Sequence, residues 1–257
     1  MSALFPRRAV LTGLAAMAGC ACHGSAFAQG EMRQRINPEG CMLATAEASA
    51  EANAAAQRTV ADYALTATRS TGDARTDRAL DTALQRLAAI LEVTPGFAFY
   101  DDYDGENACA TPAPLLGVEI GSVFFGTRMF KTLLNQDPTG GGVMWVVAHE
   151  FAHILQFQSS VRNLLLHGEK TVRRLELHAD YMAGFYLGVR KRNEPRASLF
   201  HAGESVWNAG DTYYNDPSHH GTPSERVTAS EAGFMAAYQQ QVTRDAAFQM
   251  GYDFVMG

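Results

Sequence analysis

Hydrophobic and polar positions repeat with a helical period over most of the chain. Residues 41–68 are rich in alanine and contain neither proline nor glycine, which favours one long surface helix, with low complexity as the competing interpretation. A second helix is predicted over residues 75–94, because a Pro-Gly pair follows it. Its leucines recur every three or four positions: Leu80, Leu84, Leu87 and Leu91.

The pattern changes in the middle of the chain. Residues 96–102 and 117–130 are rich in aromatic and β-branched side chains and are bounded by glycine, as strands are. The loop 104–114 separates them. We therefore expect a small antiparallel sheet at this point.

Helical periodicity returns after this sheet. One helix is predicted from about residue 142 to residue 160, and another over residues 169–191. Thr222, Pro223 and Glu225 then form the start of a further helix, with a capping box and a proline at the first helical position. The predicted fold class is α+β, mostly helical, with the small antiparallel sheet packed on the first of these helices.

The N-terminus is a different kind of sequence. Arg7 and Arg8 precede an apolar run over residues 9–21, and an Ala-Phe-Ala triplet ends at Ala28. This pattern is typical of a secretory signal peptide, here residues 1–28, so we expect export to the periplasm or out of the cell. The arginine pair leaves a twin-arginine signal and a general secretory signal both open. The apolar run is too short for a permanent membrane anchor.

Removal of the signal leaves two predicted parts, an N-terminal helical segment over residues 29–95 and a domain over residues 96–257. Cys20 follows a weak match to a lipoprotein cleavage site, so membrane association is expected only if Cys20 is lipidated. In an oxidising compartment Cys41 and Cys109 are expected to form a disulfide, with two buried thiols as the alternative.

Composition narrows the possible partners. The chain has 257 residues, of which 47% are hydrophobic, enough for a sizeable core. Its formal net charge is -6, and lysine and arginine do not form a block. A nucleic-acid partner is therefore not expected. The oligomeric state cannot be read from these features.

The clearest chemical motif lies in the predicted helix 142–160. His149 and His153 are four residues apart, about one helical turn, so their side chains point the same way and can share one metal ion. Glu150 is placed to act as the base toward a water in an open coordination position. Burying these groups in a largely apolar helix would be costly without a metal. The alternative is an ordinary helix that contains two histidines.

A catalytic zinc also needs a third protein ligand. Ser159 stands where the extended histidine motif would place a third histidine, so that form is excluded. Glu176, in the next predicted helix, is the better candidate, with Asp180 one turn later to accept a hydrogen bond from a ligand imidazole. Solvated surface charges are the other interpretation of these two acids. His178 is offset by two residues from Glu176 and is expected to face elsewhere.

Three segments, HEFAHILQ, LELHADYMAG and HHGTPSERV, together resemble the bacterial neutral zinc metallopeptidases, which are similar in layout to the gluzincins. Upstream, NACATP and GSVFFGTRMF are similar to the segment that forms the active-site edge strand in such peptidases. The resemblance covers roughly residues 105–235 and implies a zincin-like fold. It also implies one Zn²⁺ held by His149, His153 and Glu176, catalysis by Glu150 and support from Asp180.

The chain departs from this family in two ways. Ala152 stands where many relatives carry glycine, and the alanine-rich N-terminal helices match no part of the family that we can name. Neither difference removes a chemical group from the motif.

These features predict an exported zinc metallopeptidase, an endopeptidase rather than an exopeptidase. It would hydrolyse peptide bonds in peptides or proteins with a zinc-activated water and Glu150 as general base. The substrate is expected to lie along an edge strand within residues 117–126. A non-catalytic, zinc-stabilised binding or assembly factor of the cell envelope is the alternative, and a metal-free helical binding module is a third possibility.

The tetrahedral intermediate of such a reaction needs a hydrogen-bond donor. His220 is the candidate, because it adjoins the capping box and would be held firmly. His219, Tyr213 and Tyr214 remain open as alternatives.

Overall fold

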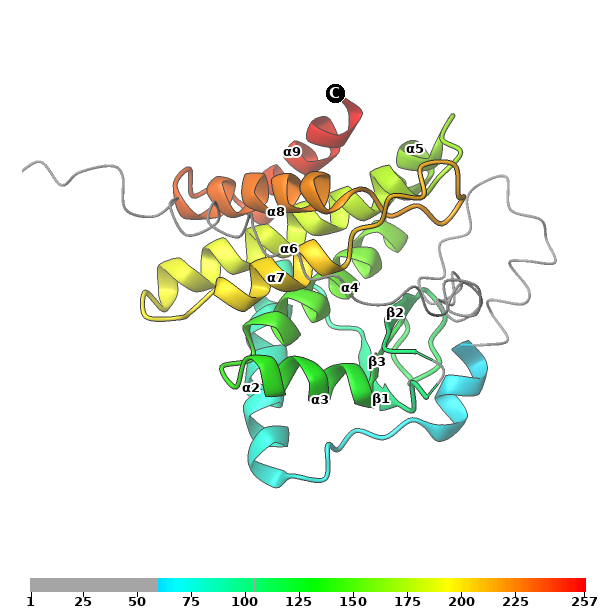
Figure 1. The fold of residues 1–257 in the computed structure, drawn as a ribbon, viewed down its shortest axis with the longest axis vertical. Helices are drawn as coiled ribbons and strands as arrows, with labels where there is room; N and C mark the ends of the chain where they lie inside the picture. The colour runs from blue at the N-terminus through cyan, green and yellow to red at the C-terminus, as the bar shows by residue number, and fades with distance from the viewer. Residues whose placement is uncertain (1–59, 104) are drawn as a thin grey trace, which may run out of the picture. The chain divides into compact units, whose positions relative to one another are not determined.

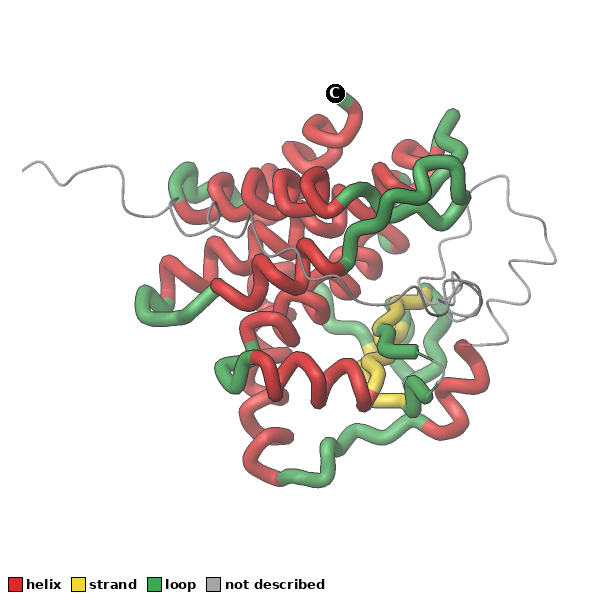
Figure 2. Tube along the Cα trace, viewed as in Figure 1, coloured by secondary structure: helices red, strands yellow, loops and turns green. Residues whose placement is uncertain are grey.

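The computed structural model describes residues 60–103 and 105–257. The predicted signal peptide, Cys20, Cys41 and most of the alanine-rich segment therefore lie outside the described residues. Residues 60–66, at the end of that segment, are helical. Helices make up most of the described chain, and the strands form one small group (Figures 1 and 2). The expectation of a mostly helical α+β fold is confirmed.

Helix α2 (Ala74–Leu91) matches the helix predicted over residues 75–94. The side chain of Asp73 accepts a hydrogen bond from the Thr76 backbone N–H at 2.7 Å, which fixes the start of the helix. The helix ends at Glu92, which has a left-handed φ of 55°.

Three short strands form a mixed sheet in the order β1-β3-β2: β1 (Gly96–Tyr100), β2 (Ala108–Thr111) and β3 (Ser122–Gly126). β1 is parallel to β3 and β2 is antiparallel to it, so the prediction of an antiparallel sheet was wrong. The cause is β2, which lies within the predicted loop and reverses the chain between the other two strands. Its sequence, ACAT, has too few β-branched or aromatic residues to predict a strand.

The position of β3 also corrects the expected substrate site. β3 is the central strand, so both of its edges are already paired. A substrate therefore cannot add to an edge strand within residues 117–126. The edge strands are β1 and β2, and Thr68 pairs with Phe99 on the outer side of β1 through backbone hydrogen bonds of 2.9 and 2.7 Å.

Helix α3 (Thr127–Gln136) begins directly after β3, where the sequence pattern predicted that the strand would continue. The buried carboxylate of Asp102 accepts hydrogen bonds from the backbone N–H groups of Arg128 and Met129, at 2.7 and 3.0 Å. These bonds satisfy the first turn of the helix and explain why the strand stops.

Helix α4 (Gly141–Phe157) carries the histidine motif and matches the helix predicted over residues 142–160. All of its residues except the last are buried. It contacts β2 and β3 on one side, and α6 (Arg173–Asn193) and α7 (Phe200–Asn208) on the others. Figure 1 shows α4 between the strands and the layer that α6 and α8 form. The motif therefore lies in the core of the described chain.

Glycines bring α6 and α8 (Pro223–Tyr238) into backbone contact. A Cβ atom at Gly184 would lie 1.9 Å from the carbonyl oxygen of Ser230, and one at Gly233 would lie 1.8 Å from that of Tyr181. Only glycine permits so close an approach. Along this contact the first turn of α8 lies beside Asp180, in the first half of α6.

The capping box predicted for α8 is present. The Thr222 hydroxyl accepts a hydrogen bond from the Glu225 backbone N–H at 3.2 Å, and the Glu225 carboxylate accepts one from the Thr222 backbone N–H at 2.9 Å. The helices α5 (Val161–Leu166), α7 and α9 (Arg244–Met256) were not predicted.

Cys109 lies in β2 as a free and fully buried thiol. Its expected disulfide partner, Cys41, lies outside the described residues. The pairing of Cys41 with Cys109 therefore stays a prediction.

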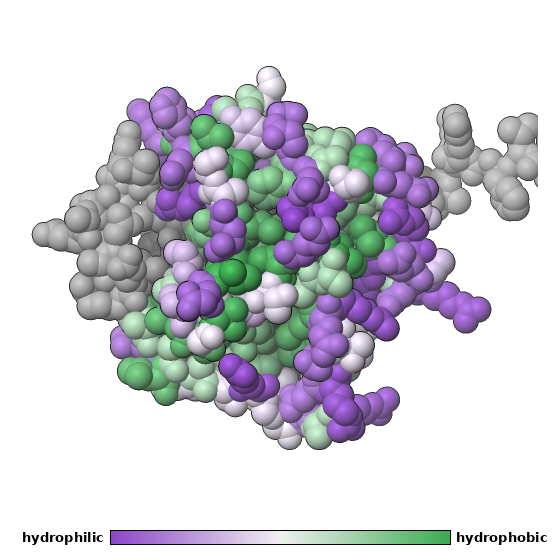
Figure 3. All heavy atoms as spheres, turned by 180° about the vertical axis from the view of Figure 1, so that it is seen from behind, coloured by the Kyte–Doolittle hydropathy of each residue, from purple (hydrophilic) through white to green (hydrophobic). Residues whose placement is uncertain are grey.

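Hydrophobic side chains gather near the centre of the face seen in Figure 3, and hydrophilic ones surround them. Five large hydrophobic or aromatic residues in the described chain are more than half exposed: Leu65, Tyr103, Trp207, Tyr213 and Tyr214. Trp207 lies near the end of α7, and Tyr213 and Tyr214 lie in the segment between α7 and α8. Within residues 60–103 and 105–257, the helices lack the combination of length and apolar character that a bilayer crossing requires.

Candidate metal centre

Three side chains from α4 and α6 converge at one buried point. His149 and His153 lie one turn apart on α4, and their Nε2 atoms are 3.0 Å apart. Glu176, on α6, places Oε2 3.2 Å from the Nε2 of His149 and Oε1 3.5 Å from the Nε2 of His153. All three residues are at most 5% exposed. The structure thus brings together the three metal ligands expected from the sequence.

This geometry fits a tetrahedral metal ion. Zinc bonds of about 2.0–2.1 Å place neighbouring ligand atoms roughly 3.3 Å apart. The two Nε2 atoms are 3.0 Å apart, and each lies 3.2 or 3.5 Å from a different carboxylate oxygen of Glu176, so either oxygen could complete the set. Oε1 of Glu176 is buried and has no hydrogen-bond partner among the described residues. Two imidazoles and one carboxylate are a usual donor set for a catalytic zinc and leave one position open.

The charges around His149 favour a cation at the same point. Burial by itself disfavours the charged imidazole, but Asp180 and Glu176 outweigh burial and raise the pKa of His149 to about 9. Without a metal the cluster therefore holds a proton. A divalent cation would compete with that proton for the same lone pair.

Asp180 lies behind His149, as expected from its spacing. Its Oδ1 is 2.9 Å from the Nδ1 of His149, so the ring donates from Nδ1 and keeps Nε2 for a ligand. Burial acts to raise the pKa of Asp180, but the charge of Arg226 and the bond with His149 outweigh it and lower the pKa. Asp180 therefore stays ionised and accepts the bond.

Arg226 is a site residue that the sequence analysis missed. Its guanidinium donates to Asp180 at 2.7 and 2.8 Å and to the carbonyl oxygen of Ala209 at 2.7 Å. It also lies 5.8 Å from the ring centroid of Trp145, close enough for a cation–π contact. One signal was present in the sequence, because a positive residue in the first turn of a helix opposes the helix dipole. Such a local conflict often marks a functional residue.

Glu150 lies beside the three converging side chains. It is 4% exposed, and its Oε2 has no hydrogen-bond partner among the described residues. Burial and the negative charge of Glu176 raise its pKa to about 7, against the opposing effects of His149 and Arg226. A carboxyl group with a pKa near neutrality can both accept and release a proton at physiological pH.

His220 reaches the site from the loop before α8. It lies near enough to act electrostatically on both carboxylates, where its effect is to lower the pKa of Glu150 and of Glu176. Asp211 holds it in place, because the Asp211 Oδ2 accepts the His220 backbone N–H at 2.9 Å and lies 3.4 Å from the His220 Nδ1. Asp211 was also missed, since it occurs in a loop without a recognisable spacing.

The alternative donors have different surroundings. His219 is buried, and its Nδ1 is hydrogen-bonded to Asp211. Tyr213 and Tyr214 are 55% and 64% exposed. In this loop His220 stays the candidate because it acts electrostatically on both site carboxylates. The buried Nε2 of His219 has no hydrogen-bond partner among the described residues and leaves that histidine as the alternative.

His178 lies outside the metal cluster, as the sequence analysis expected. It is fully buried, and its Nδ1 is 3.0 Å from the Nε2 of Gln156. Gln156 in turn places Oε1 2.8 Å from the Nδ1 of His153. This contact was missed, although Gln156 stands three residues after His153 on one helix, a spacing at which side chains meet.

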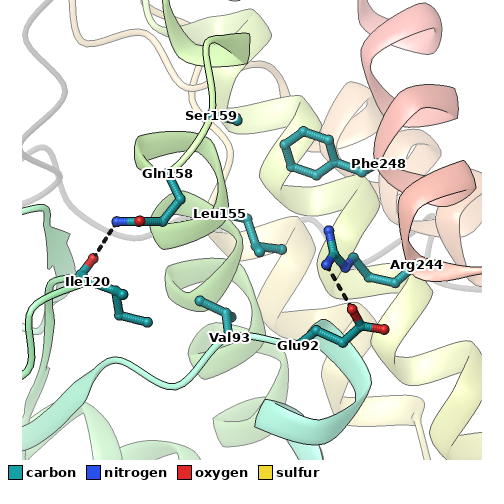
Figure 4. Close-up of a pocket in the computed structure, with 8 residues that line it drawn as sticks. All are labelled: Glu92, Val93, Ile120, Leu155, Gln158, Ser159, Arg244 and Phe248. Carbon is teal, nitrogen blue, oxygen red and sulfur yellow. Dashed lines mark hydrogen bonds and ion pairs between the residues drawn. The ribbon is translucent and has the colours of Figure 1, made fainter.

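A separate cavity of about 320 Å³ lies away from this centre (Figure 4). Arg244 and Glu92 form an ion pair of 2.9 Å on its wall. Leu155 lines the cavity two residues after His153 and so points away from that ligand. The remaining lining residues are Val93, Ile120, Gln158, Ser159 and Phe248. His149, His153 and Glu176 do not line this cavity.

The comparisons with known proteins leave the site to be interpreted from its own geometry, since no family model, curated protein or solved structure matches the chain.

Proposed function

We propose that the chain is a zinc-dependent metallopeptidase of the type that its three motifs resemble, the bacterial neutral zinc metallopeptidases, and that it acts after export. The observation that carries the proposal is the convergence of His149, His153 and Glu176 beside the buried carboxyl group of Glu150. A purely structural site would not need a base with a pKa of about 7 next to an open position.

Zinc supplies a Lewis acid that polarises the peptide carbonyl and makes a water molecule more acidic. Glu150 takes a proton from the attacking water while the new carbon–oxygen bond forms. It then gives that proton to the amide nitrogen as the carbon–nitrogen bond breaks. The pKa of about 7 suits both transfers, because neither protonation state is strongly preferred at neutral pH.

His220 is the donor that would stabilise the developing negative charge on the carbonyl oxygen. Its electrostatic effect on both Glu150 and Glu176 supports a position near these carboxylates. Asp211 contacts both the backbone and the ring of His220 and limits their movement. A donor fixed before the reaction is worth more than one that must reorganise.

The outer edge of strand β2 is the proposed place for an extended peptide, which would have to displace whatever covers this strand, because its four residues are at most 6% exposed. It packs against α4, and the negative charge of Glu150 acts on the thiol of Cys109 within the strand. A peptide paired with this strand would therefore pass close to Glu150. Backbone pairing would tolerate many sequences, which suits an endopeptidase.

Metal content and peptide hydrolysis test the proposal, with wild type compared to Glu150→Gln. The amide keeps the shape of the side chain but cannot act as the base. We expect about one zinc per chain in both proteins and hydrolysis of casein or a peptide library by wild type alone. Zinc in both proteins without hydrolysis by either would favour the non-catalytic binding factor, and absence of zinc from wild type would reject the metal site.

A further inference from the structure

A chain of buried hydrogen bonds connects the candidate metal ligand His153 to the last helix. The Nδ1 of His153 lies 2.8 Å from the Oε1 of Gln156, and the Nε2 of Gln156 lies 3.0 Å from the Nδ1 of His178. The Nε2 of His178 lies 3.1 Å from the carbonyl oxygen of Phe248 on α9. The three polar side chains are fully buried, so water does not compete for these bonds.

Two backbone carbonyl oxygens, those of Leu175 and Phe248, set the direction of every hydrogen bond in this series, because a carbonyl oxygen only accepts. The amide nitrogen of Gln156 donates to the carbonyl oxygen of Leu175 at 2.9 Å, so the amide oxygen must face His153. His178 donates from Nε2 to Phe248, so its Nδ1 carries a lone pair and accepts the second hydrogen of the Gln156 amide.

The direction of these bonds determines the state of His153. Because the Gln156 oxygen accepts from Nδ1, His153 carries its proton there and leaves a lone pair on Nε2. That lone pair points at the Nε2 of His149 and at Oε1 of Glu176, 3.0 and 3.5 Å away. The ring is thus prepared for a metal by groups that do not touch the metal position.

We propose that Gln156 and His178 are positioning residues for the metal site, which fix the tautomer of His153 and connect α9 to it. The inference rests on the proposed metal site. Asp180 fixes the tautomer of the other histidine, His149, in the same way, but there the acceptor is a charged carboxylate. The Gln156–His178 chain reaches the same result with neutral groups only.

The packing of α9 keeps the far end of the chain in place. A Cβ atom at Gly251 would lie 3.2 Å from the Cδ2 of His178, so the absence of a side chain lets the helix approach the ring. The ring of Phe248 meets that of His178 edge to face, with centroids 4.6 Å apart. The same Phe248 lines the cavity of Figure 4. A displacement of α9 would therefore break the last hydrogen bond of the chain.

Zinc affinity, measured by competition with a chromophoric chelator, tests the proposal without any substrate. Gln156→Leu should weaken zinc binding about 10- to 100-fold, the usual effect of losing such a supporting contact. His178→Phe should weaken it less, because Leu175 still orients the amide. His178→Asn, whose side-chain oxygen can accept from Gln156, should restore affinity toward wild type. Gln158→Leu is the matched control and should leave affinity unchanged, because Gln158 is the exposed C-cap residue of the same helix and its amide donates to the Ile120 carbonyl oxygen instead.

The tautomer of His153 is read by nitrogen NMR on the metal-free protein, which shows the ring nitrogen that carries the proton. Wild type should show the proton on Nδ1, and Gln156→Leu should show a mixture of tautomers. The proposal is overturned if Gln156→Leu and His178→Phe both keep the wild-type tautomer. If wild type binds no zinc, the proposed function fails, but the tautomer measurement still decides whether the positioning chain exists.

Discussion

Arg226 and Asp180 form a buried ion pair with two contacts, in which Nε lies 2.7 Å from Oδ2 and Nη2 lies 2.8 Å from Oδ1. The same Asp180 Oδ1 lies 2.9 Å from the Nδ1 of His149. The first turn of α8 is thereby connected through Asp180 to a candidate metal ligand on α4. Both partners of the pair are at most 3% exposed, so water cannot replace either of them.

Arg226→Met should therefore destabilise the protein strongly. The change leaves the charge of Asp180 buried without its main partner, and the loss of one partner from such a pair costs about 3–5 kcal/mol. Arg173→Met is the control, because Arg173 pairs with Glu225 at 2.6 Å where both side chains are about one third exposed. Its loss should cost no more than about 1 kcal/mol. Chemical denaturation measures both, and equal effects would contradict the assigned role of Arg226.

The sequence was most informative where the relevant residues lie on one helix. His149 and His153 are one turn apart, so their shared direction follows from helix geometry alone. Glu176 and Asp180 could be chosen by the same reasoning, since their spacing also places both on one face of a helix. The small residues Ala179, Ala183 and Gly184 on the same helix also permit a neighbouring helix to approach closely.

The missed features depend on contacts between distant segments. Arg226 is 46 residues from Asp180, and the crossing of α6 and α8 that joins them cannot be derived from the spacing of either helix. His178 and Phe248 are 70 residues apart, so their contact was missed for the same reason. The sheet was mispredicted because the return strand β2 has only four residues, and its alanine-rich pattern resembles a loop.

His220→Ala tests the choice of hydrogen-bond donor. If His220 stabilises the negative charge of the intermediate, its loss should lower kcat about 10²- to 10³-fold and leave zinc content unchanged. Tyr213→Phe is the control, because it removes an exposed hydroxyl from the same loop. Steady-state kinetics on one peptide substrate compares the two variants. Normal kcat in His220→Ala together with a large loss in Tyr213→Phe would assign the role to the tyrosine.

Gly233→Ala should destabilise the crossing of α6 and α8. The added carbon would lie 1.8 Å from the Tyr181 carbonyl oxygen, a distance that forces the two backbones apart. Such overpacking costs about 1–3 kcal/mol or more. Gly203→Ala is a matched change in helix α7, where no atom lies within 4 Å of the new carbon. It should stabilise by about 0.5–1 kcal/mol through helix propensity. Thermal unfolding distinguishes them, and a stabilising Gly233→Ala would contradict the close crossing.

Glu225 should make stability depend on pH in the acidic range. Burial raises the pKa of this carboxyl group, but the bonds from Arg173 and Thr222 outweigh burial and lower the pKa from 4.5 to about 2. Because the folded-state pKa is below the unfolded one, the contribution is fully present above about pH 4.5. It is lost as pH falls from there toward 2.

Glu225→Gln isolates this contribution, because glutamine can still accept the Thr222 backbone N–H but has no charge to offer Arg173. At pH 6 the variant should be less stable than wild type by about 0.5–1 kcal/mol, the upper part of the range for a partly exposed ion pair. The difference in the free energy of unfolding should shrink steadily between pH 4.5 and pH 3, although other carboxylates destabilise both proteins there. A difference that stays constant over this range would mean that the carboxylate keeps its ordinary pKa in the folded protein and that the capping bonds do not favour its charge.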